Sequence, residues 1–148
     1  MRTVLTLTAL LLVFGCATNS GAPGPEPDVN LYQISRVAPG TEHDTGPLSA
    51  QFAVEVKNTL TQPLSLRRVA VQSIGGGSYT LPSYSQAFNE TIAPGETKRV
   101  AFWAPAYVSM NTVGGANGPV TLRAALEFEA GGKKFQKVEV QNVGTLGD

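Results

Sequence analysis

The residues of this sequence with the strongest intrinsic reactivity are its single cysteine and its single histidine. Cys16 is the only cysteine among 148 residues, which excludes an intramolecular disulfide or a paired-cysteine redox motif. His43 stands between Glu42 and Asp44 in a stretch bordered by glycine and proline. A histidine base needs a positioned nucleophile and an orienting partner, and the sequence marks neither. Because adjacent side chains of an extended chain point to opposite sides, we interpret residues 42–44 as a solvated loop, not a metal site.

The glycine clusters also fail to indicate a cofactor site. Residues 75–77, 114–115 and 131–132 are not followed by the Lys-Ser/Thr pair of a phosphate-binding loop, so they predict turns. The acidic residues are scattered along predicted strands, and no pair is placed for acid and base catalysis. We therefore expect a protein that is not an enzyme and that binds neither a cofactor nor a metal.

The chemistry of Cys16 depends on the segment that precedes it. Arg2 supplies positive charge, residues 4–14 form an apolar run broken only by two threonines, and Gly15 is small. This is the layout of a secretory signal peptide. The apolar run is shorter than the roughly 18 residues that a membrane-spanning helix needs. We therefore predict that residues 1–15 are a signal peptide.

The sequence Val13-Phe14-Gly15-Cys16 resembles the lipobox of bacterial lipoproteins. The resemblance implies cleavage before Cys16, a diacylglycerol on its sulfur and, in many species, a further acyl chain such as palmitate on the new amino group. Gly15 and Val13 fit the pattern, whereas Phe14 departs from the usual small residue. Two or more acyl chains anchor a protein stably, where one chain does so only marginally. The alternative is an ordinary exported protein with a chance cysteine near its cleavage site.

The resemblance also implies a location. A lipoprotein signal predicts a lipid-anchored protein of the cell envelope, whose first partner is membrane lipid, held through the acylated Cys16. Ala17 follows that cysteine, where an aspartate would retain a lipoprotein in the inner membrane of enteric-type bacteria. Ala17 therefore favours the outer membrane, on its periplasmic face.

The rest of the chain divides into a linker and one domain. Residues 17–28 contain three prolines, two glycines and no large apolar residue, so we expect a linker over residues 16–29. Fully extended, about twelve residues at roughly 3.3 Å each reach about 40 Å. Residues 30–148 suit a single domain with its own core. Eleven Lys and Arg balance eleven Asp and Glu, and this balance gives no sign of nucleic-acid binding.

Beyond residue 30 the apolar residues recur with period two and nowhere with period 3.6, which predicts strands. The apolar parity changes after Leu66, so we predict a β-bulge at Arg67-Arg68. Residues 93–96 predict a turn, and residues 104–119 a long crossing loop. The expected strands cover residues 31–37, 51–58, 64–74, 78–81, 86–92, 96–103, 120–129 and 133–143. The expected inward residues include Phe52, Val54, Val56, Val100, Phe102, Val120, Leu122, Ala124, Leu126 and Phe128.

The last two expected strands form a hairpin whose register can be predicted. Residues 131–132 suit a two-residue turn. An unbroken ladder would set the apolar Leu126 opposite Lys137, so we predict a bulge at Gln136. The expected cross-strand pairs are Glu129 with Lys134, Phe128 with Phe135, Glu127 with Lys137, Leu126 with Val138 and Ala124 with Val140.

Seven or eight short antiparallel strands predict an all-β fold, an immunoglobulin-like β-sandwich, with a small β-barrel as the alternative. The sequence lacks the Cys–Trp–Cys core of antibody domains, and Trp103 is not on the third strand. The resemblance is therefore to the wider class of exported bacterial Ig-like domains.

Four aromatic residues in or beside the connections are the candidate partner-binding residues: Tyr79, Tyr84, Trp103 and Tyr107. Tyrosine and tryptophan are enriched at binding hot spots, and Trp103 points outward if Phe102 points inward. The alternative is that these rings cap the open end of the core. For the basic residues near Arg67 and in the last strand, interleaved glutamates predict a mixed, salt-paired face and not a basic patch.

These observations predict a membrane-anchored envelope lipoprotein that acts as a non-enzymatic binding or accessory module. Its partner would be another envelope protein or a cell-wall component. A second hypothesis is a structural or stress-related domain without a dedicated partner, because Asn58 with Pro63-Leu64-x-Leu66 resembles desiccation-associated Ig-like domains over one turn and one strand. A third is a hydrolase of envelope esters that uses His43.

Overall fold

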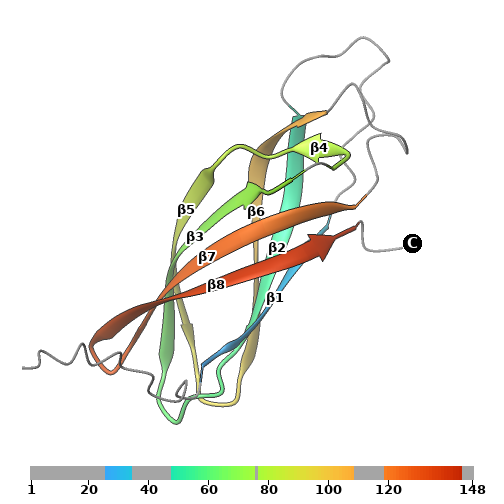
Figure 1. Ribbon diagram of the computed structural model, residues 1–148. Coiled ribbons are helices and arrows are strands. Elements are labelled where there is room, and N and C mark those ends of the chain that lie inside the picture. Colours follow the sequence, from blue (N-terminus) through green and yellow to red (C-terminus); the bar gives the residue numbers. More distant parts are fainter. Residues whose placement is uncertain (1–25, 35–47, 76, 109–118, 145–148) are drawn as a thin grey trace, which may run out of the picture.

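The computed structural model describes residues 26–34, 48–75, 77–108 and 119–144 of the chain. All regular structure in these residues is antiparallel β-strand, arranged in two facing sheets (Figure 1). The strands are β1 (Asp28–Gln33), β2 (Leu48–Lys57), β3 (Leu64–Ser73), β4 (Tyr79–Thr80), β5 (Tyr84–Ile92), β6 (Thr97–Val108), β7 (Val120–Ala130) and β8 (Lys133–Val143). Sheet A has the order β1-β2-β6-β4, and sheet B has the order β5-β3-β7-β8.

The strand order confirms the predicted all-β sandwich. Strands β1, β2 and β6 lie together in one sheet and β3, β7 and β8 in the other, which is the A-B-E and C-F-G grouping of immunoglobulin-type domains. On one side the two sheets approach each other at their edges. There the backbone N–H of Leu31 on β1 donates to Oε1 of Gln141 on β8 at 3.0 Å. This side of the sandwich is therefore partly closed, in the manner of half a barrel.

The core lies between the sheets and follows the predicted alternation. Phe52 and Phe102, neighbours across β2 and β6, are at most 3% exposed, with ring centroids 5.9 Å apart. Each such ring buries a large apolar area. Each expected inward residue is buried: Phe52, Val54, Val56, Val100, Phe102, Val120, Leu122, Ala124, Leu126 and Phe128.

The bulge predicted in β3 is confirmed. The register of β3 shifts between Leu66 and Arg68 against both of its neighbours. The extra residue leaves Arg67 and Arg68 both on the outer side of sheet B, where successive residues would otherwise alternate. Their guanidinium groups reach two glutamates of β7, Glu129 at 3.2 Å and Glu127 at 3.5 Å. Because of the bulge, each of the two adjacent arginines forms an ion pair with a glutamate of β7.

The register of the last hairpin is confirmed only near its turn. The pairs of Phe128 with Phe135 and of Glu129 with Lys134 form as expected. The bulge predicted at Gln136 is wrong, because the ladder continues unbroken and Leu126 faces Lys137. The physical reason is that β8 is an edge strand beside β1 and not a strand inside a closed core. Charged residues on its inner side can therefore form ion pairs at the sandwich rim.

The rim position explains how the inner charges of β8 are satisfied. The Lys137 ammonium lies 3.2 Å from the Glu139 carboxylate and 3.6 Å from that of Glu26. As a consequence of the unbroken ladder, Val138 and Val140 lie on the outer side, where they are 43% and 56% exposed. The pairs predicted for these two valines, with Leu126 and Ala124, do not form.

Asn58 holds together the turns at one end of the sandwich. Its Nδ2 donates to the backbone oxygens of Gln62 and Ile92, both at 2.9 Å, and its Oδ1 accepts from the N–H of Leu60 at 2.9 Å. Its backbone oxygen accepts from the N–H of Gly95 at 2.8 Å, inside the turn predicted over residues 93–96. Gly95 has a φ of 77°, which a glycine adopts without strain. One buried amide thus links the β2–β3 and β5–β6 connections.

Several strands differ in their bounds from the expected ones, among them β2, which begins at Leu48, and β5, which begins at Tyr84. β1 begins at Asp28, within the segment predicted as a linker, and Thr59 Oγ1 donates to the backbone oxygen of Glu26 at 2.6 Å just before it. β6 continues to Val108, so the prediction of a loop from residue 104 is wrong for residues 104–108, which are strand. It accommodates Pro105 because β4 pairs only with the last two residues of β6, so the missing N–H interrupts no ladder there. Residues 35–37 of the first expected strand and 109–118 of the expected loop lie outside the described residues.

Candidate binding surface

The outer face of sheet A carries a group of exposed apolar side chains. Trp103 is 53% exposed, Tyr107 45% and Ile34 38%. Tyr32 lies half-buried on the same face. We call these four residues the aromatic face. Folded domains rarely leave connected apolar surface in water unless something binds there.

The sheet register shows that part of the aromatic face is continuous across three strands. The N–H of Ile34 donates to the backbone oxygen of Gln51, and Gln51 pairs with Trp103, so these three residues form one row. In the adjacent row Ala53 pairs with Tyr32 on one side and with an alanine of β6 on the other. Ala53 lies between the inward-facing Phe52 and Val54, so alternation places it on the outer side, yet it is fully buried.

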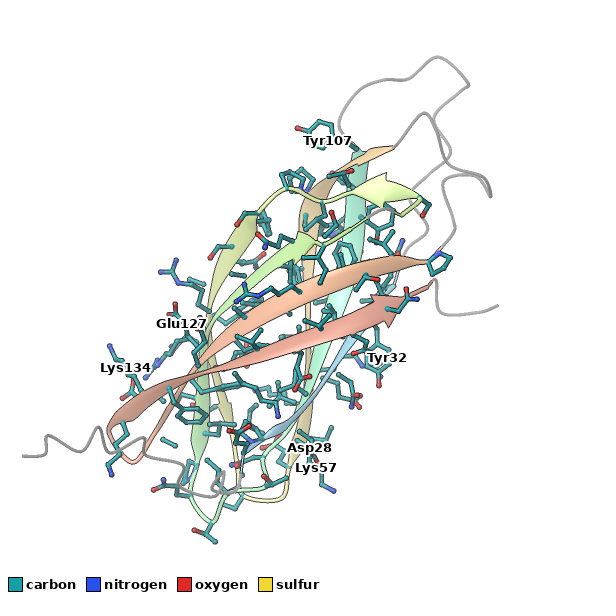
Figure 2. The ribbon with its side chains drawn as sticks, viewed as in Figure 1. Asp28, Tyr32, Lys57, Tyr107, Glu127 and Lys134 are labelled. Atoms are coloured by element: carbon teal, nitrogen blue, oxygen red, sulfur yellow. The ribbon has the colours of Figure 1, made fainter. Side chains whose placement is uncertain are left out.

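Strand β6 carries the face along the length of the molecule. Trp103, Pro105 and Tyr107 share one parity of an extended strand, so their side chains project to the same side. Tyr107 lies where β6 pairs with β4, and Figure 2 shows it at the opposite end of the sandwich from Asp28 and Lys57. The predicted outward orientation of Trp103 is confirmed, because Phe102 beside it is buried.

A charged pair borders the face at the Asp28 end of sheet A. Arg99 Nη2 donates to Glu55 Oε2 at 2.8 Å, across adjacent strands. The guanidinium carbon of Arg99 also lies 5.0 Å from the centre of the Tyr32 ring, a cation–π arrangement. These contacts fix the orientation of Tyr32 and give the face one polar border.

Of the four aromatic residues expected to bind a partner, two are well exposed. Trp103 and Tyr107 lie together on the aromatic face. Tyr84 is half-buried, and its ring stacks on that of core residue Phe102 with centroids 6.5 Å apart. Tyr84 therefore belongs mainly to the packing of β5 against sheet A.

The expectation that Tyr79 contacts a partner is wrong. Tyr79 is 2% exposed, and its hydroxyl donates to Gln33 Oε1 at 2.8 Å in the interior. Burial raises the pKa of the Tyr79 phenol above its ordinary value, because the phenolate would lose its hydration. The two-residue strand β4 turns this side chain inward, which a short strand between glycines and Pro82 does not reveal in the sequence.

Two members of the aromatic face were missed by the sequence reasoning. Tyr32 and Ile34 were not proposed as binding residues, although Leu31 lies inward and the alternation along the first strand places both on the opposite side. The signal was present in the period of two. What it lacked was knowledge that β1 and β6 belong to the same sheet.

The charged side chains of the described residues are largely paired with each other, which confirms the predicted salt-paired surface. Besides the two arginine–glutamate pairs on sheet B, Lys98 Nζ lies 2.6 Å from Glu90 Oε2. The hydrogen bond to Glu90 raises the pKa of Lys98 above its ordinary value. These pairs place opposite charges side by side on the described surface.

A hollow of about 590 Å³ lies beside the β7–β8 hairpin, and the Arg67 side chain that lines it is hydrogen-bonded within the chain. Arg67 reaches into it and donates to Glu129 and to Asn89 Oδ1 at 2.6 Å. Within the described ranges, no cluster of three or more His, Cys, Asp or Glu side chains could hold a metal ion. Those ranges also contain no helix long and apolar enough to cross a membrane.

Cys16, the predicted lipidation site, lies outside the described residues, as do Ala17 and the linker up to residue 25. The same holds for His43 with Glu42 and Asp44. Their roles stay predictions from the sequence.

Comparisons with known proteins show the fold alone. Neither a protein-family model nor a curated protein sequence matches the chain. A solved structure from the Northeast Structural Genomics Consortium, target SoR45, superposes with a TM-score of 0.51 at 10% identity, covering 82% of this chain and 87% of that one. A protein from Archaeoglobus fulgidus superposes with a TM-score of 0.50 at 11% identity, covering 78% and 91%. At these identities the likeness carries no activity or ligand.

Proposed function

We propose that this protein is a lipid-anchored module of the bacterial cell envelope that binds another envelope component through the aromatic face. The observation that carries the binding role is the exposure of Trp103, Tyr107 and Ile34 on one face of one sheet. The observation that carries the anchor is the lipobox-like sequence ending at Cys16. The partner is an envelope protein or a cell-wall component.

The chemistry of the aromatic face suits a binding surface. Tryptophan and tyrosine provide large, stiff contact areas and dominate the energetics of many interfaces. Ala53 has a small, buried side chain, whereas Trp103 and Tyr107 on β6 have large, exposed ones. The ion pair of Arg99 with Glu55 forms a polar rim, as interfaces commonly have around an apolar centre.

The position of the tether supports the same arrangement. The chain enters the domain at Glu26 and Asp28, next to Thr59 and the β2–β3 turn. β6 starts at that end, where Thr97 pairs with Lys57, and extends away from it. At about 3.3 Å per residue, Tyr107 is roughly 33 Å from that start. A domain anchored through residues before Glu26 would therefore direct Tyr107 away from the lipid surface.

Fatty-acid labelling tests the anchor. Cells that express the full chain should incorporate labelled palmitate into it, and it should sediment with the outer membrane. The Cys16→Ala variant should lose the label and leave the membrane fraction. A wild-type chain that stays unlabelled and soluble would overturn the anchor, although the aromatic face could still bind a partner.

Paired variants test the binding surface. The double variant Trp103→Ala, Tyr107→Ala removes the two most exposed rings, while Arg68→Ala alters an equally exposed side chain on the outer face of sheet B. We expect crosslinking of the full-length protein to one envelope component, or its pelleting with purified cell wall, to be lost in the double variant only. Retention in both variants, or no bound component for the wild type, would exclude this function.

A structural or stress-related domain without a dedicated partner is the second candidate. It is favoured by the internal pairing of surface charges and by the turn that Asn58 locks next to Pro63 and Leu64. This candidate predicts that cells carrying the double variant survive drying as well as wild type, whereas cells without the protein do not. Under the binding hypothesis, the double variant and the deletion have the same phenotype.

A further inference from the structure

The outer side of sheet A is uncharged over the part that holds the aromatic face. The register places a connected set of side chains there, between the row of Tyr32 and the far end of β6. They are Tyr32, Ile34, Ser49, Gln51, Ala53, Thr80, Ala101, Trp103, Pro105 and Tyr107. None of these described residues is acidic or basic, in a chain with eleven Lys and Arg and eleven Asp and Glu. An uncharged ligand suits this surface, because a charged one would lose hydration there without gaining a counter-charge.

The charged side chains of the same outer side lie at the end where the tether enters. Glu55 and Arg99 form their ion pair one row beyond Tyr32. Asp28 and Lys57 face each other in the next row, at the end of the sandwich opposite Tyr107 (Figure 2). The uncharged part therefore begins beside Ala101 and continues along β6 for about 20 Å.

The exposed rings of β6 follow one another along the strand. The Cα atoms of Trp103 and Tyr107 are four residues apart on an extended chain, which is about 13 Å. Pro105 lies half-buried between them on the same side of the strand. A compact small molecule would contact only one of these rings at a time. The spacing therefore fits a chain-like ligand that lies along β6.

The size of the uncharged part also favours a narrow ligand. At about 4.8 Å between strands, the three strands β1, β2 and β6 and a length of about 20 Å give roughly 300 Å². An ordinary protein–protein interface buries about 800 Å² on each partner. The uncharged part is smaller than such an interface, and its dimensions suit the contact of a single extended chain.

Neutral polar side chains lie beside the rings. Gln51 is in the same row as Trp103. Ser49 and Thr80, both exposed, pair with residues of β6 further along the strand. Hydroxyl and amide groups both donate and accept hydrogen bonds, so they can match a ligand rich in hydroxyl groups without any charge.

We propose that the ligand of the aromatic face is an uncharged polysaccharide chain, the glycan strand of the cell wall, whose pyranose rings stack on Trp103 and Tyr107. This inference rests on the proposed function and names the class of its ligand. The C–H groups on the flat side of a pyranose carry partial positive charge, which the negative face of an aromatic ring attracts. The hydroxyl and amide groups at the edge of the sugar then reach the neutral polar side chains beside the rings.

Fluorescence tests this ligand directly, because Trp103 is the only tryptophan of the chain. The probe is the hexasaccharide of N-acetylglucosamine, added to the full-length protein in a detergent without a sugar headgroup. We expect a saturable shift of the emission to shorter wavelength as the Trp103 ring leaves water. The Kd should be the same at about 0.05 M and about 0.5 M salt, because no charges meet in the complex. Emission that does not change at millimolar hexasaccharide, or a Kd that rises steeply with salt, would overturn the proposal.

Tyr107→Ala tests the chain-like contact and keeps Trp103 as the reporter. Wild type should bind the hexasaccharide about fivefold or more tightly than the disaccharide, which is too short to reach both rings. Tyr107→Ala should remove most of that difference. Val140→Ala, which shortens an exposed apolar side chain on sheet B, is the matched control and should preserve it. A difference that persists in Tyr107→Ala, or that Val140→Ala also removes, would contradict the proposed site.

The failure of this inference differs from the failure of the proposed function. If the hexasaccharide leaves the fluorescence unchanged while the double variant Trp103→Ala, Tyr107→Ala still loses a crosslinked envelope protein, the ligand is a protein. The polysaccharide is then wrong and the binding function stands. If the hexasaccharide does not bind and the double variant loses no envelope component, both proposals are wrong.

Discussion

The outer faces of the two sheets are both formed by antiparallel strands, but they differ in whether their side chains find partners within the chain. On sheet B, Arg67 and Arg68 reach Glu129 and Glu127 on the neighbouring strand, so the charges of that face are paired within the chain. On sheet A, the aromatic face leaves the rings of Trp103 and of Tyr107 partly in water. A self-paired face needs no ligand, whereas exposed rings gain free energy when a partner covers them. The difference supports the proposal that sheet A is the binding side.

The largest expected loss of stability comes from the inner side of β6, and the outer side of the same strand provides the comparison. Phe102→Ala should destabilise the domain by about 3–5 kcal/mol, because it opens a cavity among packed rings. Trp103→Ala, one residue further, should cost less than about 1 kcal/mol, because more than half of that side chain is already exposed. Urea unfolding followed by circular dichroism measures both. Similar losses would mean that Trp103 is a packing residue and that sheet A has no free aromatic face.

The next largest expected loss of stability is at Asn58, which holds the turns at one end of the sandwich. Asn58→Ala should cost about 3 kcal/mol, because it leaves the backbone oxygens of Gln62 and Ile92 and the N–H of Leu60 without their side-chain partner. The same unfolding experiment measures it. Asn58→Asp is the control: it keeps the acceptor for Leu60 but removes both donors. A loss below that of Trp103→Ala would show that the turns hold without this amide.

A smaller effect sharpens the distinction between Tyr79 and the exposed aromatic residues. Tyr79→Phe should cost about 1 kcal/mol at pH 7, through the lost hydrogen bond to Gln33. Since folding raises the pKa of the Tyr79 phenol, the folded state binds more protons than the unfolded state above pH 10, the ordinary value. Wild-type stability should therefore fall as the pH rises above 10, and Tyr79→Phe should fall less steeply. Parallel curves for the two proteins would contradict the buried position.

The smallest effect tests the self-paired face. Glu129→Gln should cost at most about 0.5 kcal/mol, because the pair with Arg67 is partly exposed and solvent screens it. At about 1 M salt, where the screening length is near 3 Å, the difference from wild type should disappear. The stability difference caused by Trp103→Ala should not shrink in the same way. Unfolding at two salt concentrations measures both, and a salt-dependent effect at Trp103 would weaken the comparison.

Several elements were predictable because their signals are local. The alternation in β2 and β7 identified the inward residues, and the change of parity after Leu66 located the bulge in β3. The turn over residues 93–96 and the turn before Lys133 follow from proline and glycine chemistry. Each of these features depends on residues that lie close together in the sequence, so the sequence was sufficient to predict it.

Other elements were not predictable because they depend on neighbours far along the chain. The bulge expected at Gln136 assumed that Lys137 would face a closed core, but β8 lies at a rim where Glu26 and Glu139 receive that charge. Tyr79 was expected to lie at the surface, and the pairing of β4 with the end of β6 buried it. Alternation predicts on which side of a strand each side chain lies, but it does not predict where that strand lies in its sheet.

The sequence by itself determined the strands, most of their inward residues and the one cysteine that ends a signal-like segment, since periodicity and local motifs encode these directly. Only the tertiary structure decided which strands are neighbours. It brought Tyr32 and Ile34 of β1 to the same face as Trp103, and it placed the charged inner side of β8 at an edge. The physical reason is that burial of a side chain depends on what packs against it, and in a sandwich those contacts come from strands far apart in the sequence.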